Sequence, residues 1–444
     1  MKTADVVVCG AGIAGVATAY HLVKRGAGRV ILVDPRPPLT LTSDKSTECY
    51  RNWWPNAAMV GLMNRSIDLL QGLAAESGDA FNLGRRGYLY VTADEARLTR
   101  LREEGAATSK LGGGELRIQR DGGYQPNGPD APADGADLFI GGDLLRRHFP
   151  FVTPAAQGAL HVRRAGWFSA QQLGAWMLER AFARGLQLIP DAVVSVGTSR
   201  EAVSGVTLDS GEEIAAPVFI NAAGPMVARV SAMIGVELPV YSEVHIKVAF
   251  RDHLGVIPRD APMFIWCDPQ RIPWSAEERR LLEEDGRAEL VGEMPASCHA
   301  RPEGGAGSQW LVGLWEYHRT IQEPTWPLPE DPLYPEVVIR GLQTMAPGLA
   351  RYLDHLPQPM VDGGYYTKTR ENRPLVGPLP LAGAFVVGAF SGFGVMAAAA
   401  AGELAALHVT GDPLPDYAPA FALSRYDDPA YLAEISQITD TGQI

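Results

Sequence analysis

A glycine-rich segment near the start of the chain has the residue spacing of a pyrophosphate-binding loop. Gly10, Gly12 and Gly15 fit the pattern G-x-G-x-x-G, with Ile13 and Ala14 between the second and third glycines. In this pattern the first glycine permits a sharp turn out of a strand, the second lets a pyrophosphate approach the main chain, and the third lets a helix pack closely on the strand. The unpaired N–H groups at the start of that helix then point at the phosphates. The segment therefore predicts a dinucleotide-binding loop.

An acidic residue completes this signal. Asp34 stands about 20 residues after the last glycine of the motif, at the end of the next apolar run. A carboxylate at this point can accept hydrogen bonds from both ribose hydroxyls of an adenosine, and it repels a 2′-phosphate. The two signals together disfavour NADP but leave FAD and NAD open. The remaining alternative is a glycine-rich turn that binds nothing.

The motif residues need a βαβ unit to hold them, and the apolar pattern predicts one. We expect a buried strand at Val6–Cys9, a helix at Ile13–Lys24 with its apolar residues on one face, and a second strand at Val30–Val33. Further strands are expected at 218–221 and 384–387, helices at 173–184 and 394–408, and strands of a second sheet at 244–250, 263–266 and 310–315.

The bulk composition argues against several classes of protein. A chain of 444 residues is too long for one simple core, so two domains or a two-part fold are expected. The 39 Lys and Arg residues are outnumbered by 51 Asp and Glu residues, and the net charge of −12 argues against nucleic acid as a partner. The four cysteines form no C-x-x-C pair, which argues against a structural zinc site and fits a reducing, cytoplasmic location. No apolar run reaches the roughly 18 residues of a membrane span, no signal peptide is expected, and the oligomeric state is left open.

Four stretches make the chain resemble the superfamily of flavoproteins that contains D-amino-acid oxidase, sarcosine oxidase and glycine oxidase. They are Gly10–Gly15 with Asp34, the polar loop 41–51, the segment 218–225, and the pair of segments 373–378 and 388–394. The resemblance extends over the whole chain. It implies an α/β fold with a Rossmann-like FAD-binding domain and a second, mostly antiparallel sheet domain of α+β type. The implied FAD-binding domain comprises residues 1–85, 150–235 and 356–444, and the implied substrate or cap domain comprises 86–149 and 236–355.

The resemblance also implies which residues bind FAD. They are Gly10, Gly12, Ile13, Ala14, Gly15, Asp34, Ser43, Ser46, Thr47, Val194, Ala223, Gly224, Gly388, Ser391, Gly392, Phe393, Gly394, Val395 and Met396. A second helix that begins near Gly394 would direct its N–H groups and dipole at the flavin ring, where they stabilise the negative charge of reduced flavin. Without the resemblance, a helix of small residues that only packs would explain this segment equally well.

Four residues are candidates for contact with the substrate. In the resembling family an arginine of the polar loop faces the substrate, and Arg51 matches it; a guanidinium suits a carboxylate because two donors meet two oxygens. His245 and Lys247 alternate along one predicted strand, so both point to the same face, and Tyr366 lies shortly before the strand beside the flavin. The alternatives are a salt bridge for Arg51 and a solvated sheet face for His245 and Lys247.

The sequence departs from the family pattern at three positions. Gly364 stands where sarcosine oxidases carry the cysteine that holds flavin covalently, so we expect non-covalent FAD. Met396 stands at the place of a lysine that binds the substrate carboxylate, and Trp315 aligns with a lysine that activates oxygen. The substrate and the electron acceptor, O2 or an electron carrier, therefore stay open.

The resemblance implies oxidation of a C–N bond in a small amine or amino acid. The expected reaction is hydride transfer to flavin N5, followed by hydrolysis of the imine, and the protein has to orient the substrate and exclude water. Three alternatives remain. They are a 2-hydroxy-acid oxidoreductase on the same fold, a flavoprotein subunit that passes electrons to a protein partner, and a plain NAD-binding protein.

Overall fold

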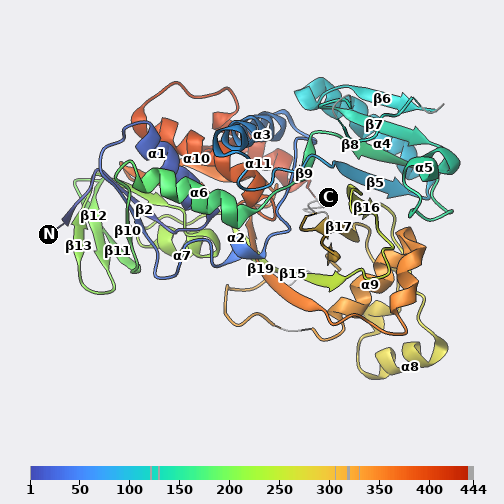
Figure 1. The fold of residues 1–444 in the computed structure, drawn as a ribbon. Helices are drawn as coiled ribbons and strands as arrows, with labels where there is room; N and C mark the ends of the chain where they lie inside the picture. The colour runs from blue at the N-terminus through green and yellow to red at the C-terminus, as the bar shows by residue number, and fades with distance from the viewer. Residues whose placement is uncertain are drawn as a thin grey trace.

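The chain folds around two large β-sheets that lie beside each other (Figure 1). The structure is a computed structural model that describes residues 2–120, 123–128, 131–305, 307–317, 321–329 and 331–438. One sheet has six strands in the order β10-β3-β2-β14-β21-β20, and the other has nine in the order β19-β15-β18-β17-β16-β5-β8-β7-β6. These sheets confirm the predicted α/β fold with a second sheet domain.

The six-stranded sheet is built from short runs of buried apolar residues. Its strands are β2 (Val6–Cys9), β3 (Val30–Val33), β10 (Gln187–Ile189), β14 (Val218–Asn221), β20 (Leu375–Pro378) and β21 (Ala384–Gly388). All neighbouring pairs are parallel except β20 with β21. Strands of this kind are apolar throughout because elements cover both faces of a parallel sheet. The βαβ unit predicted from the glycine motif is confirmed, with the same bounds.

Helices cover one face of this sheet and a small second sheet covers the other. Val6 and Val8 pack into the cluster under the helices α1 (Ile13–Lys24), α3 (Ala57–Ser77), α6 (Ala170–Phe182) and α10 (Gly394–Thr410). Val7 and Phe219 pack on the opposite face against β1 (Lys2–Thr3), β11 (Val193–Ser199), β12 (Ala202–Leu208) and β13 (Glu213–Ala215). The helix predicted from residue 173 begins earlier, at Ala170, because the Ser169 side chain accepts a hydrogen bond from the N–H group of Gln172.

The nine-stranded sheet is mostly antiparallel, as predicted. Its strands are β5 (Tyr88–Thr92), β6 (Leu116–Gln119), β7 (Ala136–Ile140), β8 (Gly158–Val162), β15 (Tyr241–Arg251), β16 (Met263–Trp266), β17 (His299–Glu303), β18 (Trp310–Leu314) and β19 (Met360–Lys368). Only β16 with β5 and β6 with β7 are parallel. The strands β8 and β19 come from ranges that were expected in the FAD-binding domain. The division of the chain into residue ranges stays a prediction.

Shorter elements lie between the six-stranded and nine-stranded sheets or beside them. The helix α2 (Thr42–Lys45) and the strand β4 (Cys49–Arg51) lie in the polar loop, and β4 pairs with β9 (Ala165–Trp167). The other α-helices are α4 (Glu95–Thr108), α5 (Gly142–His148), α7 (Val227–Ala232), α8 (Ala276–Glu284), α9 (Tyr334–Met345) and α11 (Pro429–Ser436). No helix in the described ranges is long and apolar enough to cross a membrane.

The helices α1 and α10 approach each other so closely that only a glycine fits between them. A Cβ atom on Gly402 would lie 2.6 Å from the carbonyl carbon of Ala17 and 2.7 Å from the nitrogen of Thr18. We expect Gly402→Ala to lower the free energy of unfolding by about 1–3 kcal/mol, because backbone has to move to admit the methyl group. Urea denaturation measures this change.

Gly72 in α3 is the matched control. A Cβ atom there would meet nothing within 4 Å. We expect Gly72→Ala to raise the free energy of unfolding by about 0.5–1 kcal/mol, since alanine favours a helix over glycine. Equal destabilisation by both substitutions would show that the packing argument is wrong.

Candidate FAD site

A cavity of about 490 Å³ opens at the carboxyl ends of the parallel strands. Cys9, Val33, Ala222 and Val387 line it, and each belongs to or directly follows a different strand of the six-stranded sheet. In open α/β sheets ligands bind outside the carboxyl ends of the strands, where the connections diverge to opposite faces. The cavity therefore has the position of a nucleotide site.

The glycine loop forms one wall of this cavity. Gly10 has a φ of +106°, and a Cβ atom there would lie 2.4 Å from the carbonyl oxygen of Ala222. A Cβ atom on Gly15 would lie 1.8 Å from the carbonyl oxygen of Gly10, so both positions exclude a side chain. Gly12 is different, because a Cβ atom there would meet only the Ser43 hydroxyl, at 3.3 Å. The absent side chain of Gly12 thus leaves main chain open to the cavity, as a pyrophosphate requires.

Asp34 fixes the next part of the wall. One carboxylate oxygen accepts a hydrogen bond of 2.8 Å from the N–H group of Ala11, and the other accepts one of 2.9 Å from the N–H group of Arg36. Each carboxylate oxygen can accept a further bond. The carboxylate is therefore pre-positioned beside the cavity for the hydroxyls of a ribose.

A second helix N-terminus, that of α10, also lines the cavity. The turn between β21 and α10 contains two non-glycine residues in the left-handed region, Ala389 with φ 57° and Ser391 with φ 52°. The N–H group of Ser391 donates to the Thr367 carbonyl of β19 at 2.8 Å, which ties this turn to the nine-stranded sheet. Gly394 begins α10 and Phe393 offers no side-chain cap. The first N–H groups of α10 can therefore act on negative charge in the cavity.

Most of the residues that the sequence predicts for FAD binding line the cavity. These are Gly10, Gly12, Ile13, Ala14, Asp34, Ser43, Ser46, Val194, Ala223, Gly224, Gly388, Ser391, Gly392, Gly394 and Val395. Val194 is 45% exposed, so it is a wall residue and not a core residue. The wall presents bare main chain, two helix N-termini and a carboxylate, which are groups that a dinucleotide site uses.

Four of the predicted FAD residues lie outside the cavity wall. Gly15 packs beneath the loop, and Phe393 packs edge-on against Trp54 with ring centroids 5.1 Å apart. The carbonyl of Met396 accepts a bond from the hydroxyl of Ser66 within the helix layer. The carbonyl of Thr47 accepts a bond of 2.8 Å from Arg301.

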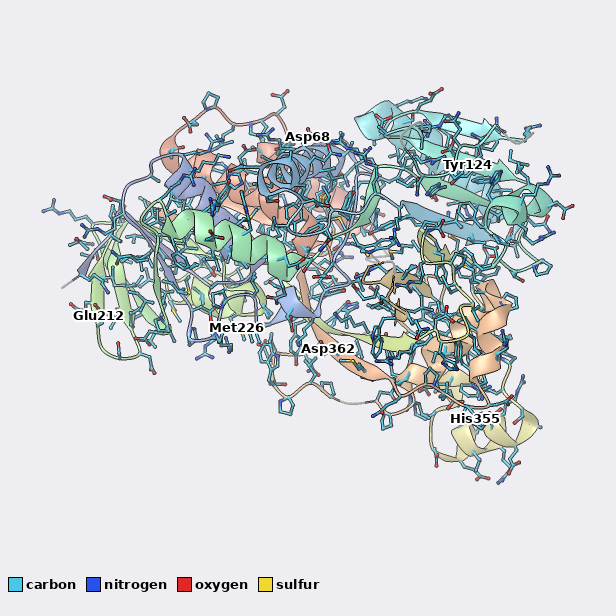
Figure 2. The ribbon with its side chains drawn as sticks, in the orientation of Figure 1. Asp68, Tyr124, Glu212, Met226, His355 and Asp362 are labelled. Carbon is cyan, nitrogen blue, oxygen red and sulfur yellow. The ribbon has the colours of Figure 1, made fainter. Side chains whose placement is uncertain are left out.

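The structure adds wall residues that sequence reasoning missed. Met226, Arg229 and Met233 line the cavity from the segment after β14, and Met226 is labelled in Figure 2. Asp209 and Arg36 also line it. Arg36 follows Asp34 closely and could have been suspected. Asp209 follows β12 of the four-stranded sheet and the other three follow β14, so their positions depend on how these segments pack.

A chain of buried ionic groups crosses the nine-stranded sheet next to the cavity. Lys368 Nζ lies 2.6 Å from a carboxylate oxygen of Glu243. The His245 ring lies between two carboxylates, with Nε2 3.3 Å from Glu243 and Nδ1 3.3 Å from Glu316. The His245 ring also stacks on the Tyr366 ring at 3.9 Å and 18°. Since Tyr366 lines the cavity, this chain reaches its wall.

The two carboxylates favour the protonated form of His245. Burial by itself lowers the pKa of His245, but hydrogen bonds to Glu243 and Glu316 outweigh burial and raise that pKa above its usual value of 6.5. Burial raises the pKa of Glu316, but the hydrogen bond to His245 together with the positive charges of His245 and Lys368 outweighs burial and lowers that pKa to about 2. Glu243 and Glu316 have no sequence signal beyond their places beside predicted strands.

Lys247 and Arg51 lie near the cavity without lining it. Lys247 Nζ donates to the Ser46 carbonyl at 2.8 Å, and burial lowers the pKa of Lys247. Arg51 is 8% exposed; its Nε donates to the Trp53 carbonyl at 3.2 Å and its guanidinium lies over the Trp54 ring at 4.5 Å. Lys247 thus braces the polar loop, and the Arg51 guanidinium is held by Trp53 and Trp54.

A surface ion pair also joins the polar loop to the nine-stranded sheet. Lys45 of α2 pairs at 3.1 Å with Asp362 of β19, which is labelled in Figure 2.

Two curated proteins are similar to part of the chain. Mitochondrial sarcosine dehydrogenase of Mus musculus is 25% identical over 260 residues, which are 56% of this chain and 25% of that protein. Hydrogen cyanide synthase subunit HcnC of Pseudomonas aeruginosa is 26% identical over 267 residues, 54% of this chain and 62% of HcnC. The alignments therefore span less than two thirds of either relative.

Solved structures share the fold over nearly the whole chain. L-proline dehydrogenase from P. horikoshii matches with a TM-score of 0.74 and 20% identity, over 96% of this chain and 98% of that one. Glycine oxidase from Geobacillus kaustophilus matches with a TM-score of 0.73 and 17% identity, over 96% and 99%. Iminodiacetate oxidase from Chelativorans sp. BNC1 matches with a TM-score of 0.71 and 20% identity, over 94% and 98%.

The family itself is recognised from the sequence. Residues 5–407 match the DAO family, described as FAD dependent oxidoreductase. This match confirms the resemblance inferred from the glycine motif and the segments around Asp34 and Gly388. The chain therefore belongs to the DAO family of FAD-dependent oxidoreductases.

Proposed function

We propose that this enzyme oxidises a C–N bond of a small amine or amino acid. The proposal rests on a contact between two features. The cavity at the carboxyl ends of the parallel strands, called the FAD cavity from here on, is lined by Tyr366. The Tyr366 ring stacks on the ring of His245, which belongs to the buried ionic chain of the nine-stranded sheet. A site for an apolar substrate has no use for such groups, which are costly to bury. The names of the structural relatives support the same class, since they refer to proline, glycine and iminodiacetate.

Bound FAD supplies a hydride acceptor at N5. The protein orients the substrate and keeps water away from it, and water returns when the imine is hydrolysed. We assign the substrate carboxylate to Arg51, whose guanidinium plane is fixed by the Trp54 ring. We assign the positioning of Tyr366 to His245, and that of the loop at Ser46 to Lys247.

We also propose that FAD is held without a covalent bond. Gly364 replaces the cysteine expected from the resembling oxidases, and a Cβ atom on Gly364 would lie 3.3 Å from the Cα atom of Thr42. The polar loop thus closes tightly over this point of β19. Precipitation of the protein with acid should release all of the flavin into the supernatant; flavin retained in the pellet would contradict this proposal.

The substrate class is tested by an anaerobic screen. We expect at least one amine or amino acid to bleach the visible absorbance of the bound flavin, because hydride transfer reduces it. If only a 2-hydroxy acid bleaches it, the amine proposal is wrong. Air is then admitted to the reduced enzyme, and rapid recovery of the colour identifies O2 as an acceptor, whereas slow recovery indicates an electron carrier.

The role of Asp34 is tested by cofactor affinity. We expect Asp34→Asn to weaken FAD binding about 10- to 100-fold, because a charge-assisted hydrogen bond to a ribose hydroxyl contributes about 1.5–3 kcal/mol. Quenching of flavin fluorescence on titration with apoprotein measures the affinity. Asp44→Asn is the control, since Asp44 lies in the polar loop but does not line the cavity. Equal affinities for the two variants would remove Asp34 from the site.

The ionic chain makes a prediction about pH. The folded-state pKa of His245 lies above 6.5, so the stability that its bonds contribute is complete below about pH 6.5 and is lost as pH rises through the folded pKa. The difference in unfolding free energy between the wild type and His245→Gln should therefore shrink as pH rises. Glu316→Gln should lower the pKa of His245, as measured by NMR titration of the imidazole. A His245 pKa that is unchanged in this variant would show that Glu316 is not its partner.

A further inference from the structure

A segment without helix or strand extends from the nine-stranded sheet to the wall of the FAD cavity. It comprises residues 321–329 and is the orange loop below α2 in the view of Figure 1. Its first residues are tied to β15, because Ile321 forms a bridge with Glu243 and the N–H group of Gln322 donates to the Ser242 carbonyl at 3.0 Å. We call residues 321–329 the clasp segment.

The hydroxyl of Tyr365 anchors the middle of the clasp segment. It donates to the Thr325 carbonyl at 2.9 Å, and it accepts from the N–H group of Thr325 at 3.0 Å and from the side-chain amide of Gln322 at 2.7 Å. A hydroxyl has one donor and two acceptor lone pairs, so these three bonds match its capacity. Tyr365 belongs to β19 and lines the FAD cavity. The clasp segment is thus fixed to the cavity wall.

Trp326, the next residue, connects this point to the six-stranded sheet. Its ring packs edge-on against the Tyr365 ring, with centroids 5.2 Å apart. The guanidinium of Arg36, just beyond the end of β3, lies over the Trp326 ring at 5.9 Å. Arg36 also lines the FAD cavity. One indole therefore contacts two wall residues, one from each of the two large sheets.

The contacts of Trp326 serve this wall and not a hydrophobic core. Trp326 is 39% exposed and belongs to none of the core clusters that the described residues form. Within the described ranges Arg36 forms no ion pair, so the indole is the main contact of its guanidinium. Aromatic faces attract guanidinium groups, and edge-on ring pairs are also favourable.

These contacts hold the wall together where residues from the two sheets meet. The polar loop makes one further tie at this place, since the Thr42 hydroxyl donates to the Tyr365 carbonyl at 3.3 Å. Arg36 lies two residues after Asp34, the residue expected to bind the ribose, and Tyr365 precedes Tyr366 on β19. Separation of Arg36 from Tyr365 would therefore widen the FAD cavity along its length.

We propose that Trp326 is a clasp for the cofactor. By joining Arg36 to Tyr365, it keeps the wall of the FAD cavity closed and slows the release of bound FAD. Trp326 is a positioning residue, because it acts through two residues of the wall. This inference does not depend on which substrate the enzyme oxidises.

The test measures how fast bound FAD leaves the protein. Holoenzyme is incubated with an excess of isotopically labelled FAD, and the label that becomes bound is followed over time after gel filtration. We expect Trp326→Ala to exchange its FAD about tenfold faster than the wild type, because the ring pair with Tyr365 and the contact with Arg36 are both lost. Exchange at the wild-type rate would overturn the proposal.

Two control variants separate the clasp from a general loosening of the segment. Trp326→Phe keeps a ring against Tyr365 and should retain most of the slow exchange. Ile321→Ala, at a position that is 64% exposed in the same segment, should exchange at the wild-type rate. The midpoint of urea unfolding of the apoprotein should be the same in Trp326→Ala and in the wild type. If all three variants exchange equally fast, or if the midpoint of Trp326→Ala falls, the clasp is contradicted.

A double-mutant cycle tests the link to the six-stranded sheet. We expect Arg36→Met to speed exchange by itself, since Arg36 lines the cavity. In the Arg36→Met background, Trp326→Ala should speed exchange by a smaller factor than in the wild type, because its contact with the guanidinium is already absent. Equal factors in the two backgrounds would show that Trp326 does not act through Arg36, and would overturn the proposal.

Discussion

Direct contact between main chains around Gly10 holds the nucleotide-binding half together. The φ of Gly10 is +106°, and its missing Cβ atom leaves room for the Ala222 carbonyl, which joins the end of β14 to the glycine loop. Because Gly15 has no side chain, α1 packs directly against the same loop. Because Gly402 has none, α10 packs directly against α1. These contacts direct the N-termini of two helices, one after β2 and one after β21, at a single cavity. A methyl group at Gly10 or Gly15 would move one of those helix ends away from it.

The nine-stranded sheet places buried ionic groups beside the nucleotide-binding half. Burial of separate charges is costly, and in this sheet Lys368 and His245 each contact a carboxylate, Lys368 that of Glu243 and His245 those of Glu243 and Glu316. These ionic groups lie on β19, on β15 and just after β18. The Tyr366 ring, which stacks on His245, also lines the FAD cavity. Glu316 is the terminal member of this group of charges.

Met396 and Trp315 stand where the resembling oxidases carry lysines, and the structure shows where both side chains lie. Met396 is buried in the helix layer, where its carbonyl accepts a bond from Ser66, and Trp315 packs into the core behind the nine-stranded sheet. Neither position offers a cation to the cavity. The cations nearby have other partners: Lys247 bonds the Ser46 carbonyl and Lys368 bonds Glu243. In this protein Lys247 supports the polar loop and Lys368 pairs with Glu243.

The sequence alone determined the nucleotide-binding half to a large extent. The strand at Val6–Cys9, the helix at Ile13–Lys24 and the acid at Asp34 were predictable because glycine spacing, apolar periodicity and a local turn are properties of adjacent residues. The face shared by His245 and Lys247 was predictable for the same reason, since residues alternate along a strand. Only the tertiary structure decided their partners. Lys368 meets Glu243, and Glu316 meets His245, because β15 lies between β19 and β18 in the sheet. Beyond Lys247 and Leu314 the strands β15 and β18 part where the Tyr334 hydroxyl of α9 bonds both of them. Such contacts depend on long-range packing, which no local pattern encodes.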